Sequence, residues 1–230
     1  MKRSEINRII RETEQLLAAH QIELPPFMKW TPEEWAEKGP ECQEIRDNQL
    51  GWDITDFGSD DFAHTGLTAL TLRNGNQKDP VRYPKPYAEK ILIAREGQVT
   101  PFHFHWYKME DIINRGGGIL AMQLYCADEN EGLDTEKDVV IISDGVRLVL
   151  PAGSILELKP GQSVTYTQYM YHKFWGKEGC GDVIIGEVSM CNDDDTDNRF
   201  LYGQGRFPAI EEDEPPYRLL CKEYPAAGEA

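Results

Sequence analysis

The sequence predicts a mainly β protein, an antiparallel sandwich or barrel preceded by N-terminal helices. Short β-rich runs follow one another from about residue 66, and turn signals such as Asn74-Gly75 and Asp144-Gly145 separate them. No helical pattern lies between these runs, and helix signals are confined to the first third of the 230-residue chain. Many closely spaced strands without intervening helices are typical of a β-sandwich or barrel.

The first third of the chain contains three predicted helices. Apolar residues recur there at helical spacing after Ser4, which we expect to cap the first helix: Ile6, Ile9, Ile10, Leu16 and Leu17. Thr31 and Glu34 form a capping box, with Pro32 at the first helical position of a second, short helix. A third helix is expected within residues 41–50.

The β-rich part contains nine predicted strands. They are Gly66–Leu72, Ile91–Ala94, Val99–His105, Ile119–Tyr125, Val139–Ile142, Val146–Leu150, Ile155–Leu158, Val164–Tyr169 and Val183–Met190. We therefore divide the chain into a helical segment packed on the barrel (1–65), the barrel (66–206) and a C-terminal tail (207–230). The tail is rich in proline and acidic residues, and we expect it to wrap the outside of the fold.

Composition narrows the classes of function. The formal net charge is −16 and no stretch is strongly basic, which disfavours nucleic acid and anionic membrane as partners. The five cysteines are odd in number and include no CxxC pair, so reduced thiols are expected rather than a disulfide framework. The start of the chain does not resemble a signal peptide, and no apolar run approaches the ~18 residues of a membrane span. These features predict a cytoplasmic protein.

Three of the five histidines and one glutamate form a candidate metal site. His103 and His105 are two residues apart, so on a strand their side chains point to the same face. Glu110 follows five residues later, and His172 lies on a distant strand that a barrel can bring opposite. A single buried histidine is more often a hydrogen-bonded core residue. Several polar groups on one barrel face are costly to bury without a partner, which favours a bound metal ion.

Two segments resemble the paired motifs of the cupins. GQVTPFHFHWYKMEDIINRGG matches the spacing of the first motif, and GQSVTYTQYMYHKFWG matches the interval that leads to His172 in the second. The second motif is degraded, because Thr167, Tyr169 and Gly176 replace its usual Pro, Gly and Asn. The resemblance implies a cupin-type, jelly-roll-like antiparallel barrel. Three imidazoles and a carboxylate suit Mn, Fe, Co, Ni or Zn, and on an octahedral ion they leave two adjacent positions open.

Other polar residues near these motifs are candidates for catalysis or sugar binding. Lys108 lies between two expected ligands, Lys90 precedes them on a strand, and Glu187 is a lone carboxylate in an apolar strand. An inward-facing glutamate is costly unless it is paired or functional, although an exposed position remains the alternative. Trp106 and Trp175 suit stacking on a sugar as well as barrel packing. The acidic loop with Asp193 and Asp194 suits a site as well as a solvated rim.

Cupins serve many functions, so the fold leaves three classes open. These are an aldose–ketose isomerase or epimerase, a metal-dependent dioxygenase, and a non-catalytic sugar-binding protein. No NAD fingerprint or other organic-cofactor motif is visible. An isomerase would need a base to move a proton between C1 and C2 of an open-chain sugar, and these residues include candidates for it. Glu187 is the candidate base, with Lys108 or Lys90 stabilising charge on the sugar oxygens. Hydride transfer stays open.

A closer resemblance extends along almost the whole chain. LPPFMKWTPEEW, LGWDITDFG, YAEKILI, HFHWYKMEDIINRGGG and GEVSMCNDDDTDN are similar to segments of the bacterial D-lyxose ketol-isomerase family. This resemblance implies a cupin homodimer that uses Mn²⁺, although other divalent metals remain possible. It implies interconversion of D-lyxose with D-xylulose, and in many members of D-mannose with D-fructose. The metal positions of the family fall on His103, His105, Glu110 and His172.

Overall fold

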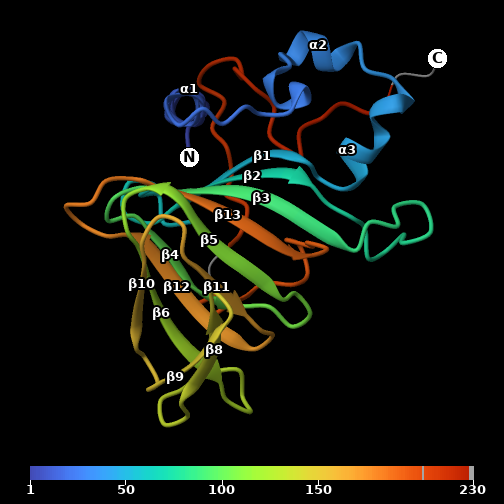
Figure 1. The fold of residues 1–230 in the computed structure, drawn as a ribbon. Coiled ribbons are helices and arrows are strands. Elements are labelled where there is room, and N and C mark those ends of the chain that lie inside the picture. Colours follow the sequence, from blue (N-terminus) through green and yellow to red (C-terminus); the bar gives the residue numbers. More distant parts are fainter. Residues whose placement is uncertain (204, 228–230) are drawn as a thin grey trace.

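Two curled antiparallel sheets form a barrel, and helices and the C-terminal tail lie over the larger sheet (Figure 1). The computed structural model describes residues 1–203 and 205–227. The mainly β, cupin-type fold expected from the sequence is confirmed. Among the described residues, the longest helix has 17 residues, and none of the helices is long and apolar enough to cross a membrane.

The helices occupy the N-terminal part, as expected. They are α1 (Arg3–Ala19), the 3₁₀ turn η1 (Pro26–Lys29), α2 (Pro32–Ala36), the 3₁₀ turn η2 (Pro40–Cys42) and α3 (Gln43–Asp47). The capping box of α2 is confirmed, because the Thr31 hydroxyl accepts from the Glu34 amide at 3.2 Å and the Glu34 carboxylate accepts from the Thr31 amide at 2.8 Å. The predicted Ser4 cap is wrong. Lys2 is the N-cap of α1, and the Ser4 hydroxyl donates to Asp213 at 2.6 Å.

The larger sheet has the strand order β1-β2-β3-β13-β5-β11-β8-β9. Its strands are β1 (Gly51–Thr55), β2 (Leu67–Arg73), β3 (Tyr87–Ala94), β5 (Glu110–Gly117), β8 (Val139–Ser143), β9 (Val146–Leu150), β11 (Ser163–Tyr166) and β13 (Val183–Met190). The sequence analysis did not predict β1 or β5, and it extended β11 three residues too far. Strand β1 lies in segment 1–65, which is therefore not purely helical.

The smaller sheet has the order β10-β6-β12-β4-β14, with β7 paired to β6. Its strands are β4 (Val99–Phe104), β6 (Leu120–Ala127), β7 (Leu133–Asp134), β10 (Ile155–Leu158), β12 (Met170–Gly176) and β14 (Arg199–Phe200). In the pairing of β12 with β4, His172 lies opposite His103, and the register shifts just beyond this pair. Such irregularities often occur beside functional sites, where they redirect side chains.

Two main apolar clusters hold these layers together. The first fills the barrel between the two sheets and includes Leu92, Leu124, Val164 and Ile185. The second lies on the outer face of the larger sheet and joins α1 to strands β1, β2, β3 and β13. Residues that alternate along β13 therefore serve both clusters, since Ile185 faces the barrel and Ile184 faces α1.

A polar clamp fixes the C-terminal tail to α1, as Figure 1 shows by the red tail beside the blue helix. The Arg3 side chain is almost fully buried, and its guanidinium donates to Glu212 at 2.7 and 2.8 Å and to Glu223 at 2.5 and 3.2 Å. Asn7 adds hydrogen bonds to Glu214 and to the Pro215 carbonyl. Because these contacts span the two ends of the chain, they fix the path by which the tail approaches the barrel.

We expect Arg3→Ala to lower the free energy of unfolding by about 1.5–3 kcal/mol, as for other hydrogen bonds to charged groups. The hydrogen bond from Arg3 holds the pKa of Glu212 below its ordinary value. A depressed folded-state pKa contributes stability above the unfolded pKa, and the contribution is lost as pH falls through the folded value. The difference between wild type and variant, measured by chemical denaturation, should therefore shrink below about pH 4. An equal difference at pH 7 and pH 3.5 would contradict this account.

Candidate active site

Three histidines meet inside the barrel. Along β4 the side chains alternate, so Phe102 and Phe104 join an apolar cluster outside the barrel while His103 faces inward. His105 follows at the end of β4, and β12 brings His172 opposite His103. One nitrogen from each of the three rings lies within 4.8 Å of the others. The expected grouping of the three histidines is therefore present.

Backbone carbonyls fix the protonation of all three rings. Nδ1 lies 2.8 Å from the Pro101 carbonyl in His103, 2.6 Å from the Asp197 carbonyl in His105, and 3.0 Å from the Met170 carbonyl in His172. A carbonyl can only accept, so each Nδ1 carries a proton and donates it. Each neutral ring then has its lone pair on Nε2, the atom that is free to bind a metal.

Burial favours the neutral form of two of these rings, His103 and His172. Removal from water, together with neighbouring histidines, holds the pKa of His103 well below its usual range. Burial also lowers the pKa of His172 to about 4, although Glu110 opposes the shift. The Tyr166 ring stacks on His172 at 4.4 Å between centroids and shields it further. At neutral pH His103 and His172 are therefore neutral rings.

The two oxygens of Glu110 face different partners. Oε1 lies 3.5 Å from Nε2 of His105 and 3.3 Å from Nε2 of His172, whereas Oε2 lies 2.8 Å from the Lys108 ammonium. Burial opposes ionisation of Glu110, but the neighbouring Lys108 ammonium outweighs burial and holds the pKa of Glu110 well below its usual range. Glu110 is therefore a carboxylate with one oxygen directed to the histidines and the other fixed by a lysine.

These four residues fit a divalent metal ion. Three imidazoles, each with Nδ1 donating to a carbonyl, present Nε2 to one space, and an ionised carboxylate oxygen borders the same space. Hydrogen bonds to the remote ring nitrogens and to the second carboxylate oxygen are the outer contacts that orient metal ligands. This donor set matches the expected ligands His103, His105, Glu110 and His172.

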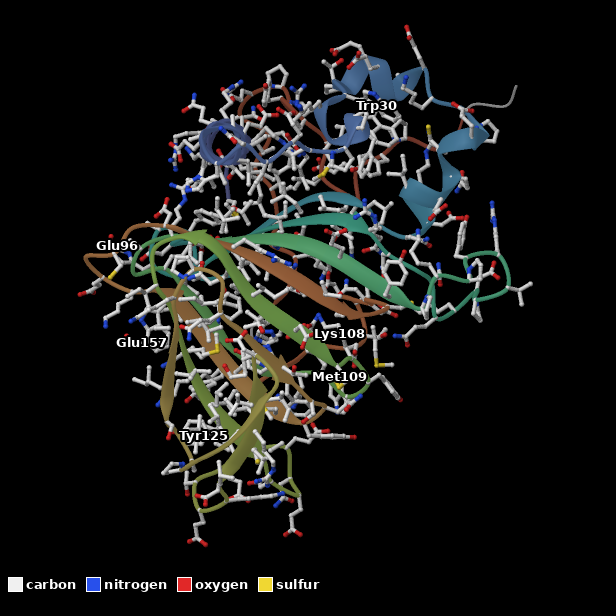
Figure 2. The ribbon with its side chains drawn as sticks, viewed as in Figure 1. Trp30, Glu96, Lys108, Met109, Tyr125 and Glu157 are labelled. Atoms are coloured by element: carbon white, nitrogen blue, oxygen red, sulfur yellow. The ribbon has the colours of Figure 1, made fainter. Side chains whose placement is uncertain are left out.

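A row of alternating charges leads away from Glu110 inside the barrel. Lys108, whose label in Figure 2 lies beside the start of β5, contacts Glu110 and also lies 3.0 Å from Glu187. Lys90 lies 3.8 Å from Glu187 and 3.4 Å from Asp194. Asp194 lies 3.8 Å from Arg206, which pairs closely with Asp53. We call these seven residues the charge row: Glu110, Lys108, Glu187, Lys90, Asp194, Arg206 and Asp53.

Strand β13 directs Glu187 into the barrel, which is one of the two positions that the sequence left open. Glu187 and Ser189 are buried, while Val188 and Met190 on the same strand are exposed. Oε1 of Glu187 accepts from Lys108 at 3.0 Å and from Ser189 at 3.1 Å. These contacts leave Oε2 of Glu187 without a hydrogen-bond donor among the described residues. The Glu187 carboxylate is thus held through Oε1, and its Oε2 remains available to accept a proton or a hydrogen bond.

The expected sugar-binding residues lie in different places. Asp194 lines the cavity with the histidines, together with Lys90, Lys108 and Glu187. Trp106 and Asp193 do not line this cavity. The Trp106 ring packs on Phe104 and donates to Glu131 at 2.9 Å, and Asp193 pairs with Lys78 at 2.7 Å. Trp175 lines a separate surface groove.

The sequence analysis missed residues that support this cavity from the acidic loop. Asp197 is buried, and its carboxylate accepts from the amides of Trp106, Tyr107 and Lys108 at 2.9–3.0 Å. The backbone carbonyl of Asp197 accepts a hydrogen bond from Nδ1 of His105. The loop was expected near the site, but several neighbouring aspartates made Asp197 impossible to single out.

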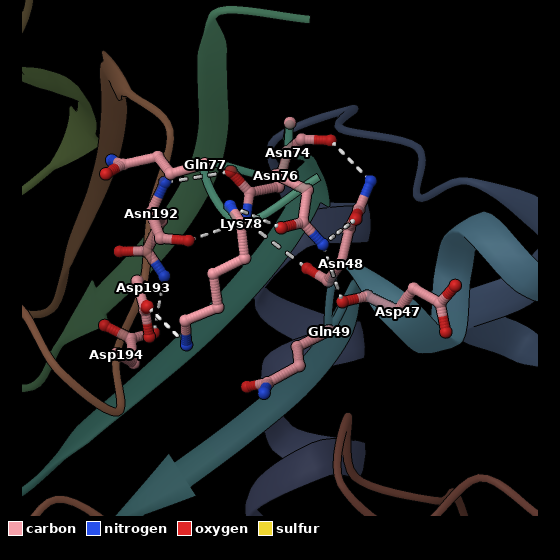
Figure 3. Close-up of a pocket in the computed structure, with 11 residues that line it drawn as sticks. Asp47, Asn48, Gln49, Asn74, Asn76, Gln77, Lys78, Asn192, Asp193 and Asp194 are labelled. Atoms are coloured by element: carbon pink, nitrogen blue, oxygen red, sulfur yellow. Dashed lines mark hydrogen bonds and ion pairs between the residues drawn. The ribbon is translucent and has the colours of Figure 1, made fainter. Parts of the chain in front are cut away.

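Asn192, also missed, joins the cavity to a neighbouring polar pocket (Figure 3). Its Oδ1 accepts from Lys90 at 2.7 Å and lies 3.4 Å from Lys108. Its backbone amide donates to Asn74, which exchanges hydrogen bonds with Asn48. This asparagine network fixes the start of the acidic loop against the turn after β2, and it thereby positions both lysines.

Comparison with known proteins identifies the family. A family model described as D-lyxose isomerase matches residues 1–224. The chain is 52% identical to a D-lyxose/D-mannose isomerase of Serratia proteamaculans and 49% identical to one of Escherichia coli O157:H7, over 97% of this chain and 98% of each relative. The chain belongs to the D-lyxose isomerase family. It is therefore an aldose–ketose isomerase.

Solved structures similar to this member of the D-lyxose isomerase family share its fold. L-ribose isomerases of Acinetobacter sp. DL28 and Cellulomonas parahominis superpose with TM-scores of 0.61 and 0.59 at 16% identity, over 92% of this chain and 98% of theirs. They are cupin-type sugar isomerases, so their likeness supports the architecture. At this identity it shows the fold alone.

We expect the wild type to retain about one divalent ion per chain, since the four candidate ligands form a single set. His103→Ala and His172→Ala should each lose the ion, because each removes a neutral imidazole donor. His64→Ala is the matched control, since His64 is exposed and pairs only with Asp61 among the described residues. The measurement is elemental analysis after desalting. Full metal content in both site variants would refute the ligand assignment.

Proposed function

We propose that this enzyme interconverts D-lyxose and D-xylulose, and also D-mannose and D-fructose. The observation that carries the proposal is the placement of Glu187 and Lys108 in the same buried cavity as the three histidines. The names of the two relatives include both aldoses. D-Lyxose and D-mannose share their configuration at C2 and C3, so one cavity can hold the reacting end of either sugar.

The site residues support a divalent ion held by His103, His105, Glu110 and His172, and we propose Mn²⁺. Such an ion, when bound, supplies positive charge that stabilises the anion formed as the α-proton leaves. The protein supplies the proton transfers. We propose an enediol-type mechanism, in which a proton moves from C2 of the aldose to C1 of the ketose and the hydroxyl proton moves from O2 to O1.

Glu187 is the proposed base. Its Oε1 is held by Lys108 and Ser189, so Oε2 is the oxygen suited to take the proton from C2 and return it to C1. A rigidly held carboxylate reaches both carbons with little movement, because they are bonded neighbours. The apolar walls of the cavity include Leu92, Ile112 and Phe174, which limit the access of water to the reacting carbons.

The two lysines have different proposed roles. Burial opposes the charge of Lys108, but Glu110 and then Glu187 outweigh it and raise its pKa. Lys108 therefore stays protonated and is better suited to stabilise negative charge on O1 or O2 than to act as a base. Lys90 contacts Asn192 and Asp194 and lies farther from Glu110. We propose that it positions the acidic loop and contacts the sugar hydroxyls, as Asp194 does.

Dioxygenase and non-catalytic binding remain the alternatives. A dioxygenase would need the metal site but not a buried glutamate held by a lysine, and a binding protein would need neither. The dimer and the cytoplasmic location stay predictions, supported by the family resemblance and by the free state of the five cysteines.

We expect the manganese-loaded enzyme to convert both D-lyxose and D-mannose to ketoses, with equal rates in air and under strict anaerobiosis. Turnover in deuterium oxide should place deuterium at C1 of the ketose or C2 of the recovered aldose, because a carboxylic acid exchanges its proton with solvent. Chromatography and NMR measure both results. Oxygen consumption would favour the dioxygenase, and complete retention of the original hydrogen would favour hydride transfer.

Glu187→Gln should keep fold and metal but lower kcat by roughly two orders of magnitude or more, as for the loss of a positioned base. Lys108→Met should lower kcat less, because the divalent ion also stabilises the developing charge. Glu157→Gln is the control, since this carboxylate pairs with Lys177 on the surface. Near-normal kcat in Glu187→Gln, with metal content equal to wild type, would move the base to another residue.

A further inference from the structure

The short loop between β4 and β5 determines where Lys108 and two candidate metal ligands lie. His105 directly follows the last residue of β4, Lys108 stands within the loop, and Glu110 is the first residue of β5. The Lys108 ammonium has two carboxylate partners, Glu110 at 2.8 Å and Glu187 at 3.0 Å. A change in the path of this loop would therefore displace groups of the candidate metal site and of the proton-transfer site.

The Asp197 carboxylate receives three consecutive backbone amides of the loop. One of its oxygens accepts from Trp106 and Tyr107, both at 2.9 Å, and the other accepts from Lys108 at 3.0 Å. Among the described residues, these three amides have no other hydrogen-bond acceptor. The direction of the three N–H groups, and with it the path of the loop, therefore depends on Asp197.

Asp197 is buried and acts on the site through other residues. Only 3% of it is exposed, and no cationic side chain in the part of the chain that the structure describes pairs with its carboxylate. A buried carboxylate needs donors in place of water, and the three amides supply them. The Asp197 carbonyl also accepts from Nδ1 of His105 at 2.6 Å. Asp197 itself does not line the cavity that contains the histidines.

A carboxylate suits this position better than an amide of the same size. Both oxygens of an aspartate accept, whereas an asparagine has one accepting oxygen and an NH₂ group that only donates. If the oxygen of Asp197→Asn faced Trp106 and Tyr107, its NH₂ group would face the Lys108 amide. The backbone that carries the Lys108 side chain would then lose its anchor. A misplacement of about 1 Å in a reacting site can lower the rate by about a hundredfold.

We propose that Asp197 is a positioning residue for the isomerisation. It holds the loop in the path that places the Lys108 ammonium between Glu110 and Glu187, and it acts on the reaction through Lys108 without touching the sugar. This inference rests on the proposed charge-stabilising role of Lys108.

The test is a double-mutant cycle on kcat for D-lyxose. Asp197→Asn should lower kcat about tenfold or more and change KM less, because a misplaced Lys108 stabilises the transition state less. In the Lys108→Met background the same substitution should have almost no further effect, since the group that Asp197 positions is then absent. Metal content by elemental analysis and the far-UV circular dichroism spectrum should match those of the wild type.

Asp195→Asn is the matched control. Asp195 lies on the same acidic loop, but its carboxylate pairs with Lys222 and accepts from Gln49 near the surface. This variant should keep the kcat of the wild type in both backgrounds.

A normal kcat in Asp197→Asn would overturn the inference, and so would an equal loss of kcat with and without Lys108. Loss of the metal in Asp197→Asn would also contradict it, because Asp197 would then act through His105. If this variant does not fold, Asp197→Ser, which keeps one small acceptor, takes its place in the cycle. Failure of both variants to fold would show that Asp197 serves the fold alone. A normal kcat in Lys108→Met, or a wild type inactive on every aldose, would instead refute the proposed function.

Discussion

The structure depends on keeping several charges inside an apolar barrel. Isolated buried ions are strongly disfavoured, so each must be paired and hydrogen-bonded. The charge row meets this requirement, because every carboxylate in it contacts at least one cation. Glu110 links the charge row to the histidines. The Nδ1 atom of each histidine donates a hydrogen bond to a backbone carbonyl. The barrel can therefore contain ionised side chains, because each of them lies next to an opposite charge.

Segments outside the barrel complete this arrangement. The acidic loop provides Asp197, which fixes the backbone before β5, and Asn192, which holds both lysines. The segment leading into the tail provides Arg206, and the tail itself is clamped to α1 and bridged to β1. The N-terminal helix therefore helps to position a residue of the cavity, although it lies on the far side of the larger sheet (Figure 1).

Local patterns in the sequence were sufficient to predict much of this protein. The strand alternation around His103 predicted that His103 and His105 share a face, and the motif spacing predicted the meeting with His172. The sequence left both an inward and an exposed position open for Glu187. Residues whose role arises from long-range pairing were not predictable in this way. Asn192 and Asp197 resemble solvated loop residues in sequence, and Arg206 precedes a tail expected to lie outside. Strand β5 was missed because its glycines and charges weaken the β pattern, although its neighbours β11 and β13 bury it.

The same constraint links fold to chemistry. A cupin that only binds a metal can surround it with apolar residues, and the inward face of β13 would then carry no charge. Here β13 places Glu187 inside the barrel, and burying it requires Lys108 and Lys90. One lysine also contacts Glu110, so the carboxylate suited to move a proton and the carboxylate suited to hold the metal share a cation. This sharing fixes their separation, and it couples the proposed base to the proposed metal ligand.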